Sequence, residues 1–211
     1  MFSIPRAGMM VFVNARRALT VTFAVILKSI GTGIENGRPS GGTGGEYMEV
    51  RLISLKDLHG FYRLFCEVSA EGKYSARAAA PPIEAISRAL VQVEKNHWPV
   101  YVVEREGQIV GSAEAYPESF CRAGGSDCIG ILGIQVRRDL RRCGYWNALL
   151  AAVVSQCRDA GFMGIDLTVL KSNSAARSLY DKFGFVWLED LSPCTLASRV
   201  VHQPERLRLV F

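Results

Sequence analysis

The feature that most constrains the fold is a strand pattern, a basic turn and a helix pattern in immediate succession. Residues 128–136 are mostly β-branched and apolar, arginines occupy positions 137, 138, 141 and 142, and apolar residues then recur at the spacing of one buried helix face. These apolar residues are Leu149, Leu150, Val153, Val154 and Cys157. Such a turn leaves main-chain N–H groups unpaired at the positive end of the helix dipole, and Gly144 lets a ligand approach the backbone. The sequence therefore predicts a phosphate-binding site where this helix begins.

The same stretch resembles the acetyl-CoA-binding signature of the GNAT N-acetyltransferase superfamily. That signature is Arg/Gln-x-x-Gly-x-Gly/Ala after a strand ending in Val, and here it reads Arg141-Arg-Cys-Gly-Tyr-Trp after Val136. Residues 173–185 are similar to a second family motif, Asn-x-x-Ala-x-x-Leu-Tyr-x-Lys-x-Gly-Phe. The two motifs stand in the family's order, separated by an expected helix (147–160) and strand (165–169), and together they indicate the family.

Two residues depart from the signature. Trp146 stands where the family usually has Gly or Ala, and Arg142 where Gly is common. A tryptophan at this point either blocks the path of the pyrophosphate or turns outward from the first helical turn. Loss of cofactor binding is therefore kept as an alternative.

The resemblance implies an α/β fold, an α+β sandwich. Its central sheet is mixed and mostly antiparallel, with about six or seven strands flanked by about four helices. We assign this domain to residues 47–211, because a Gly-rich linker at residues 36–45 marks a boundary. Residues 1–46 are then an N-terminal extension, apolar and basic before the linker. Its apolar run, residues 18–27, is too short to span a bilayer, so attachment of residues 1–30 to a membrane remains only an alternative.

Periodicity predicts the remaining elements. Ser54 and Asp57 form a capping-box pattern ahead of a helix with Leu55, Leu58, Phe61, Leu64 and Phe65 on its buried side. The other expected elements are a strand at 48–53, a helix at 83–93, a hairpin of 99–104 and 108–116, a polar loop at 117–127, and closing strands at 187–191 and 206–211.

Charge and cysteine spacing limit the partners. The net charge is +5, yet the arginines concentrate in the turn, which suits a small polyanion such as CoA rather than nucleic acid. The six cysteines contain no Cys-x-x-Cys pair, so we expect neither a metal site nor a disulfide framework. We accordingly expect acetyl-CoA as cosubstrate, no metal, a cytoplasmic location, and a monomer or homodimer.

The resemblance also assigns the cofactor contacts. The main chain of Ile134, Gln135 and Val136 is expected to bind the pantetheine arm and the thioester oxygen. The pyrophosphate is expected on the loop amides of Arg142, Cys143, Gly144, Tyr145, Trp146 and Asn147, with charge-assisted bonds from Arg141 and Arg142. Asn173 is either the cap of the following helix or a contact to the pantetheine amide.

Tyr180 occupies the family's general-acid position, since a phenol with a pKa near 10 is protonated at pH 7. The proton acceptor is harder to assign, because residues 131–133, where the family often has a glutamate, cannot accept a proton. Glu114, Glu118 and Asp127 are the candidates, and each also fits a solvated carboxylate or one that attracts a cationic amine. We name Tyr180 and Glu114 as the catalytic pair of an N-acetyltransferase acting on a primary amine. The alternative is a catalytically silent module of the same fold that senses acyl-CoA or binds a protein.

Overall fold

The computed structural model describes residues 23–24, 49–72, 79–196 and 200–211. Their helices are α1 (Leu58–Ala70), α2 (Ile83–Asn96), α3 (Glu118–Cys121), α4 (Tyr145–Asp159) and α5 (Ser174–Lys182), with short 3-10 turns η1 (Leu55–Asp57) and η2 (Arg138–Leu140). The strands are β1 (Phe23–Ala24), β2 (Glu49–Leu52), β3 (Val100–Arg105), β4 (Gln108–Pro117), β5 (Ile129–Val136), β6 (Gly164–Leu170), β7 (Val186–Asp190), β8 (Cys194–Thr195), β9 (Val201–His202) and β10 (Pro204–Val210).

Eight of the described strands form one sheet, in the order β1-β2-β3-β4-β5-β6-β10-β7. Neighbouring strands run antiparallel except β5 and β6, which are parallel and joined through α4. A parallel pair needs such a crossover, because the chain must return to the end where the first strand began. Without the two-residue β1, seven strands remain, so the expected mixed, mostly antiparallel sheet is confirmed.

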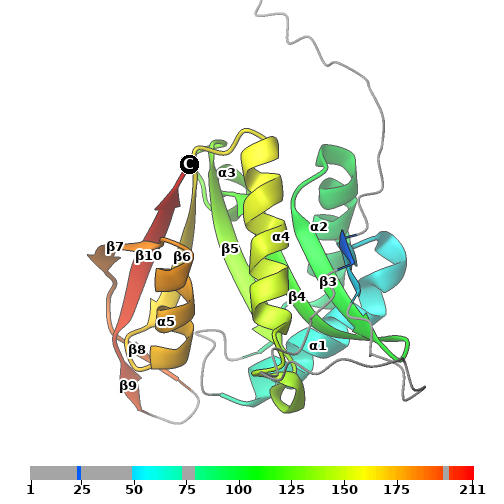
Figure 1. Cartoon of the computed structure of the whole chain (residues 1–211), viewed down its shortest axis with the longest axis horizontal. Coiled ribbons are helices and arrows are strands. Elements are labelled where there is room, and N and C mark those ends of the chain that lie inside the picture. The colour runs from blue at the N-terminus through cyan, green and yellow to red at the C-terminus, as the bar shows by residue number, and fades with distance from the viewer. Residues whose placement is uncertain (1–22, 25–48, 73–78, 197–199) are drawn as a thin grey trace, which may run out of the picture.

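Helices cover both faces of the sheet (Figure 1). Alternate residues of β3 point to opposite faces: Val100 and Val102 pack in a cluster with residues of α1 and α2, whereas Tyr101 and Val103 pack in the cluster that contains the buried residues of α4. The α1/α2 face and the α4/α5 face are therefore distinct surfaces. Because side chains alternate along a strand, the pairing register assigns each residue of the central strands to one of these two faces.

Several local predictions are confirmed. The Ser54 N–H donates to the Asp57 carboxylate at 2.8 Å, as the capping box requires. The β3–β4 hairpin turns through Glu106 and Gly107, whose φ values of 53° and 73° are those of a tight two-residue turn.

Other predictions were wrong in detail. Residues 117–127 are not wholly a loop, because α3 lies within them, and Leu55 is exposed rather than buried. The two-stranded sheet of β8 and β9 was not predicted, since two-residue strands leave no periodicity to detect.

The expected N-terminal extension lies outside the described residues, apart from Phe23 and Ala24. These two residues extend the sheet by pairing with Val50 and Glu49 of β2. Within the described ranges, no helix combines the length and the apolar character needed to cross a membrane.

Candidate active site

The central strands separate where the parallel pair would continue. β5 and β6 pair only from Ile129 with Gly164 to Ile131 with Asp166. Beyond Ile131, β5 stays paired with β4 and β6 stays paired with β10, so the two strands diverge toward the end of the sheet from which α4 begins (Figure 1). Among the strands that the structure describes, the second half of β5 thus has a partner on one side only.

The register shows which main-chain groups of β5 face that unpaired side. The Arg137 N–H donates to the Val110 carbonyl at 2.9 Å, and alternate residues of an antiparallel ladder bond to opposite neighbours. Gln135 therefore bonds toward β4, and its side chain also donates to the Ser112 hydroxyl at 3.1 Å. Ile134 and Val136 direct their N–H and C=O groups toward the side that β6 has left.

The loop before α4 has an unusual backbone at two positions. Gly144 is the N-cap of α4 with φ 84°, and Arg142 has φ 67°. Both values lie in the left-handed region, which disfavours residues with a side chain. This explains the glycine at position 144, and it explains why the family commonly has glycine where this chain has Arg142. Tyr145, Trp146 and Asn147 begin the helix, so their N–H groups lack intrahelical acceptors and form the positive end of its dipole. Cys143 is exposed in this loop.

The two arginines of the signature have different surroundings. Arg141 forms a bidentate ion pair with Glu71, at 2.5 and 2.8 Å, and its Nε donates to the Val136 carbonyl at 3.0 Å. This guanidinium ties the loop to the end of α1. The Arg142 side chain is exposed, and both arginines line a surface hollow with Arg138 and Asp139.

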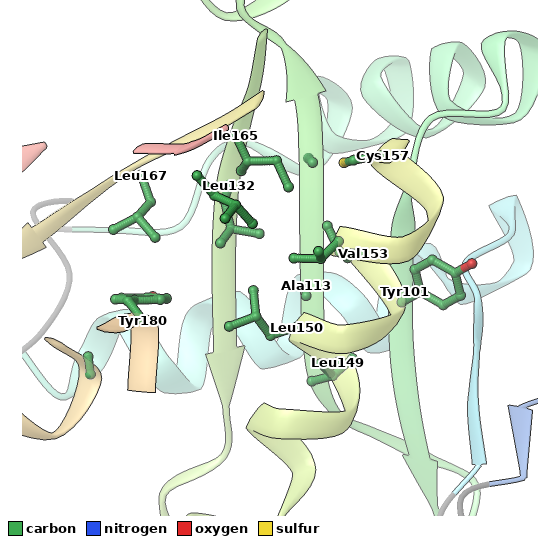
Figure 2. Close-up of a cluster of buried hydrophobic side chains, with 14 of the residues drawn as sticks. Tyr101, Ala113, Leu132, Leu149, Leu150, Val153, Cys157, Ile165, Leu167 and Tyr180 are labelled. Atoms are coloured by element: carbon green, nitrogen blue, oxygen red, sulfur yellow. The ribbon is translucent and has the colours of Figure 1, made fainter. Parts of the chain in front are cut away.

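Tyr180 lies on α5 and points into the core beside the diverging strands. Its side chain is 5% exposed, and Figure 2 shows it in the same cluster as Leu150 and Leu167. Burial raises the pKa of the phenol above its ordinary value, so the hydroxyl is protonated at neutral pH. Its ring contacts Phe185 at 5.5 Å between centroids, and the hydroxyl makes no hydrogen bond to another described residue.

One of the two alternatives for Trp146 was that its side chain turns outward from the helix. The structure shows that it does not. Its indole is partly buried against the α4 cluster and stacks at a tilt on Tyr180, with ring centroids 6.1 Å apart. The indole Nε1–H is buried and finds no acceptor among the described residues. A buried donor without a partner costs about 1–3 kcal/mol, so a ligand oxygen at this point would be stabilised.

Asn173 is the N-cap of α5. Its side-chain oxygen accepts a hydrogen bond from the Ala176 N–H at 3.2 Å, which is the capping alternative of the two that the sequence left open.

The candidate carboxylates differ in how they are held. Glu114 is 7% exposed and pairs in register with Gly133 of β5, on the α1/α2 face of the sheet. A Cβ at Gly133 would lie 2.5 Å from the Glu114 Oε1, so the carboxyl group occupies the space that a side chain at position 133 would need. This pairing places a carboxylate over β5, although β5 itself carries none.

The other two carboxylates hold a loop together. Glu118 accepts hydrogen bonds from the Ser126 N–H at 2.8 Å and from Arg122, and the Ser126 bond chiefly lowers its pKa. Asp127 accepts a hydrogen bond from the Ser119 hydroxyl. Both are engaged in structural contacts within residues 117–127.

The sequence matches the model of the acetyltransferase (GNAT) family over residues 68–185, which is more than half of the chain. The chain belongs to the GNAT acetyltransferase family. The match spans both motifs, the diverging strands and Tyr180. A comparison with curated proteins found no match.

Solved GNAT structures share this fold at low sequence identity. The ribosomal-protein-alanine N-acetyltransferase from Brucella melitensis is 20% identical with a TM-score of 0.68, over 77% of this chain and 99% of that one. A GNAT phosphinothricin acetyltransferase from Sinorhizobium meliloti, solved in complex with acetyl-CoA, is 16% identical with a TM-score of 0.67, over 78% and 88%. A GNAT acetyltransferase from Streptococcus pneumoniae is 18% identical with a TM-score of 0.68, over 78% and 99%. These similarities establish the fold.

The sequence did not reveal two contacts of this GNAT site, Arg141 with Glu71 and Gly133 with Glu114. Glu71 is far from Arg141 in the chain, and only the packing of α1 against the loop brings them together. In the sequence, Gly133 shows only the lack of a carboxylate on its own strand. In the structure, its missing side chain leaves room for the carboxyl group of Glu114. Alternation along both strands was the available signal for the second pair, but the α3 segment between β4 and β5 leaves their register open in the sequence.

Proposed function

We propose that this GNAT protein is an N-acetyltransferase that moves an acetyl group from acetyl-CoA to a primary amine in a ternary complex. The observation that carries the proposal is the divergence of β5 from β6 beyond Ile131, with the N-terminus of α4 at its open end and Tyr180 beside it. This is a place where an extended thioester arm has main-chain partners along its length.

The residues present fit such a donor. Ile134 and Val136 offer main-chain groups to the pantetheine arm, and one N–H there would stabilise the developing oxyanion. The amides that begin α4 and the exposed Arg142 suit the pyrophosphate. The buried Nε1–H of Trp146 has no acceptor among the described residues, and a carbonyl or phosphate oxygen of the donor would supply one.

In the reaction, the amine nitrogen forms a bond to the thioester carbon and the C–S bond breaks. Glu114 accepts the proton that the amine must lose, directly or through water, and Tyr180 gives its proton to the departing thiolate. Glu114 lies on the α1/α2 face and Tyr180 on the α4/α5 face, so the two groups approach the reacting centre from opposite sides of the diverging strands.

Two measurements test this function. Acetyl-CoA should raise the melting temperature of the protein, because a ligand that binds only the folded state stabilises it. With acetyl-CoA present, a panel of primary amines should release free thiol. A protein that neither binds acetyl-CoA nor releases thiol would refute the proposal.

The packing of Trp146 favours a second candidate, the catalytically silent acyl-CoA-sensing or protein-binding module. In that case the indole fills the path to Tyr180 permanently. The substitution Trp146→Gly separates the two functions. If the natural protein shows no activity and Trp146→Gly gains both acetyl-CoA affinity and turnover, the silent module is correct. If the natural protein is already active, the enzyme proposal holds.

A further inference from the structure

We propose that Glu71, the residue at which α1 ends, is a positioning residue for the binding of acetyl-CoA. It acts through Arg141, whose guanidinium it holds at the open end of the diverging strands. The inference rests on the proposed function for the identity of the ligand. It adds to the site a residue that lies in neither of the two sequence motifs.

Glu71 stands where the helix itself disfavours an acid. It is the C-cap of α1, and Gly72 follows it with φ 62°, the left-handed conformation that commonly ends a helix. The C-terminus is the negative end of the helix dipole, where lysine or arginine is favourable and a carboxylate is not. The local sequence therefore gives no reason for Glu71, and a contact from elsewhere in the fold must offset its unfavourable position.

Arg141 supplies that contact from the signature loop. Its two terminal nitrogens pair with the two carboxylate oxygens of Glu71 at 2.5 and 2.8 Å, while its Nε donates to the Val136 carbonyl at 3.0 Å. A bidentate pair fixes the orientation of the guanidinium as well as its distance. One side chain thus joins the end of α1, the end of β5 and the loop that leads to Gly144.

These three segments border the path that the proposed function gives to the cofactor. Val136 ends β5 and directs its main-chain groups to the side that β6 has left, and Arg141 precedes the N-cap of α4 by three residues. A loop that is already in its binding conformation grips a ligand more tightly, because ordering it during binding costs free energy. Glu71 therefore raises the affinity for acetyl-CoA through Arg141, by holding the loop in place.

Charge alone predicts the opposite effect, which makes the inference decidable. Arg138, Arg141 and Arg142 line one surface hollow with Asp139, and the pyrophosphate of acetyl-CoA is an anion. A carboxylate beside these arginines repels that anion over a range of about 8–10 Å at ordinary ionic strength. If Glu71 acted only as a nearby charge, its removal would tighten binding. If it positions Arg141, its removal weakens binding.

The test is a double-mutant cycle on acetyl-CoA affinity, measured by equilibrium binding to the full chain. Glu71→Gln keeps the size of the side chain and removes its charge. It should weaken binding about tenfold and raise the KM for acetyl-CoA by the same factor, with kcat within about twofold of the natural value. In an Arg141→Gln background, Glu71→Gln should weaken binding no further, because the two side chains act as one unit.

Two further variants separate geometry from charge. Glu71→Asp keeps the charge but is one methylene shorter, so it cannot hold both guanidinium nitrogens and should also weaken binding. It tests the proposal independently if Glu71→Gln fails to fold. Glu67→Gln removes an exposed carboxylate one turn earlier on α1 and is the matched control, with affinity expected to stay within about twofold.

The outcomes distinguish the role of Glu71 from the catalytic function. Equal or tighter binding in Glu71→Gln or Glu71→Asp would overturn the positioning role even if an amine is acetylated. The same loss with and without Arg141, or in Glu67→Gln, would overturn it as well. Weaker binding with the expected coupling, in a protein that releases no thiol, would support the role and refute the enzyme. A natural chain that does not bind acetyl-CoA would refute both.

Discussion

The indole of Trp146 packs against the phenol of Tyr180, with ring centroids 6.1 Å apart and ring planes at 40°. Trp146 belongs to the first turn of α4 and Tyr180 to α5, so the contact bridges the two helices that flank the diverging strands. A ligand that extends from the α4 loop to Tyr180 must pass the indole. The contact is therefore expected to change when acetyl-CoA binds.

The first prediction uses the fluorescence of Trp146. The chain has three tryptophans, and Trp98→Phe with Trp187→Phe leaves Trp146 as the remaining indole. Acetyl-CoA should change its emission, with a midpoint at the dissociation constant measured by equilibrium binding, because the surroundings of the buried ring alter. An unchanged emission despite binding would mean that the ligand avoids the indole.

The second prediction concerns the Tyr180 hydroxyl. Tyr180→Phe should lower turnover by about 10²-fold or more, as loss of a general acid would, with little change in acetyl-CoA affinity. Stability should change little, because the hydroxyl makes no hydrogen bond to a described residue and the ring is retained. A rate equal to that of the natural protein would remove Tyr180 from the mechanism.

The third prediction compares two glycines at the ends of α4. Gly144 and Gly161 have φ values of 84° and 80°, so valine at either position should cost about 1–2 kcal/mol of stability. Only Gly144→Val should also abolish the rise in melting temperature caused by acetyl-CoA, since a Cβ there blocks approach to the loop amides. A Cβ at Gly161 would meet no other atom within 4 Å, and Gly161 lies at the opposite end of α4 from the site, which makes Gly161→Val the control. Retention of the rise in Gly144→Val would locate the phosphate elsewhere.

The fourth prediction separates stability from binding at Arg142. With φ 67°, the arginine holds a backbone conformation that glycine adopts more easily. Arg142→Gly should raise the free energy of unfolding by about 1 kcal/mol in urea titrations and weaken acetyl-CoA binding. A variant that loses stability, or keeps full affinity, would contradict one half of this expectation.

The fifth prediction is a pH dependence at Asp57, which accepts a bidentate pair from Arg51 at 2.8 and 2.9 Å. Burial raises the pKa of the Asp57 carboxyl, but hydrogen bonds from Arg51 and Ser54 lower it by more, so the net pKa is below its ordinary value. The ionised carboxylate therefore contributes stability above the unfolded pKa of about 4, and this contribution is lost as the pH falls through the lower folded pKa.

Asp57→Asn should accordingly cost about 1–3 kcal/mol at pH 7. The difference from the natural protein should shrink at pH 3, as measured by urea unfolding at both values. Asp139→Asn is the control, because Asp139 pairs with Arg137 on the surface, where solvent screens the pair and its removal should change stability little. An equal loss for Asp57→Asn at both pH values would show that the charge is not responsible.

Most of the architecture followed from local patterns. Period-2 and helical spacing predicted the hairpin, β5 and α4, because each pattern reflects one buried face of one element, whereas β6 and α5 were expected from the place and content of the second motif. The two motifs predicted the family, and the family predicted the mixed sheet. Very short elements such as α3 and β8 were missed, since two to four residues are too few for a period to repeat.

The sequence by itself determined the order of the longer elements, the glycine before α4 and the tyrosine on α5, because these depend on neighbours within a few residues. Only the tertiary structure decided that Trp146 covers Tyr180, that Arg141 is held by Glu71, and that Glu114 fills the space over Gly133. Each of those contacts joins residues distant in the chain. Their geometry depends on the register of strands and the packing of helices, which no local pattern encodes.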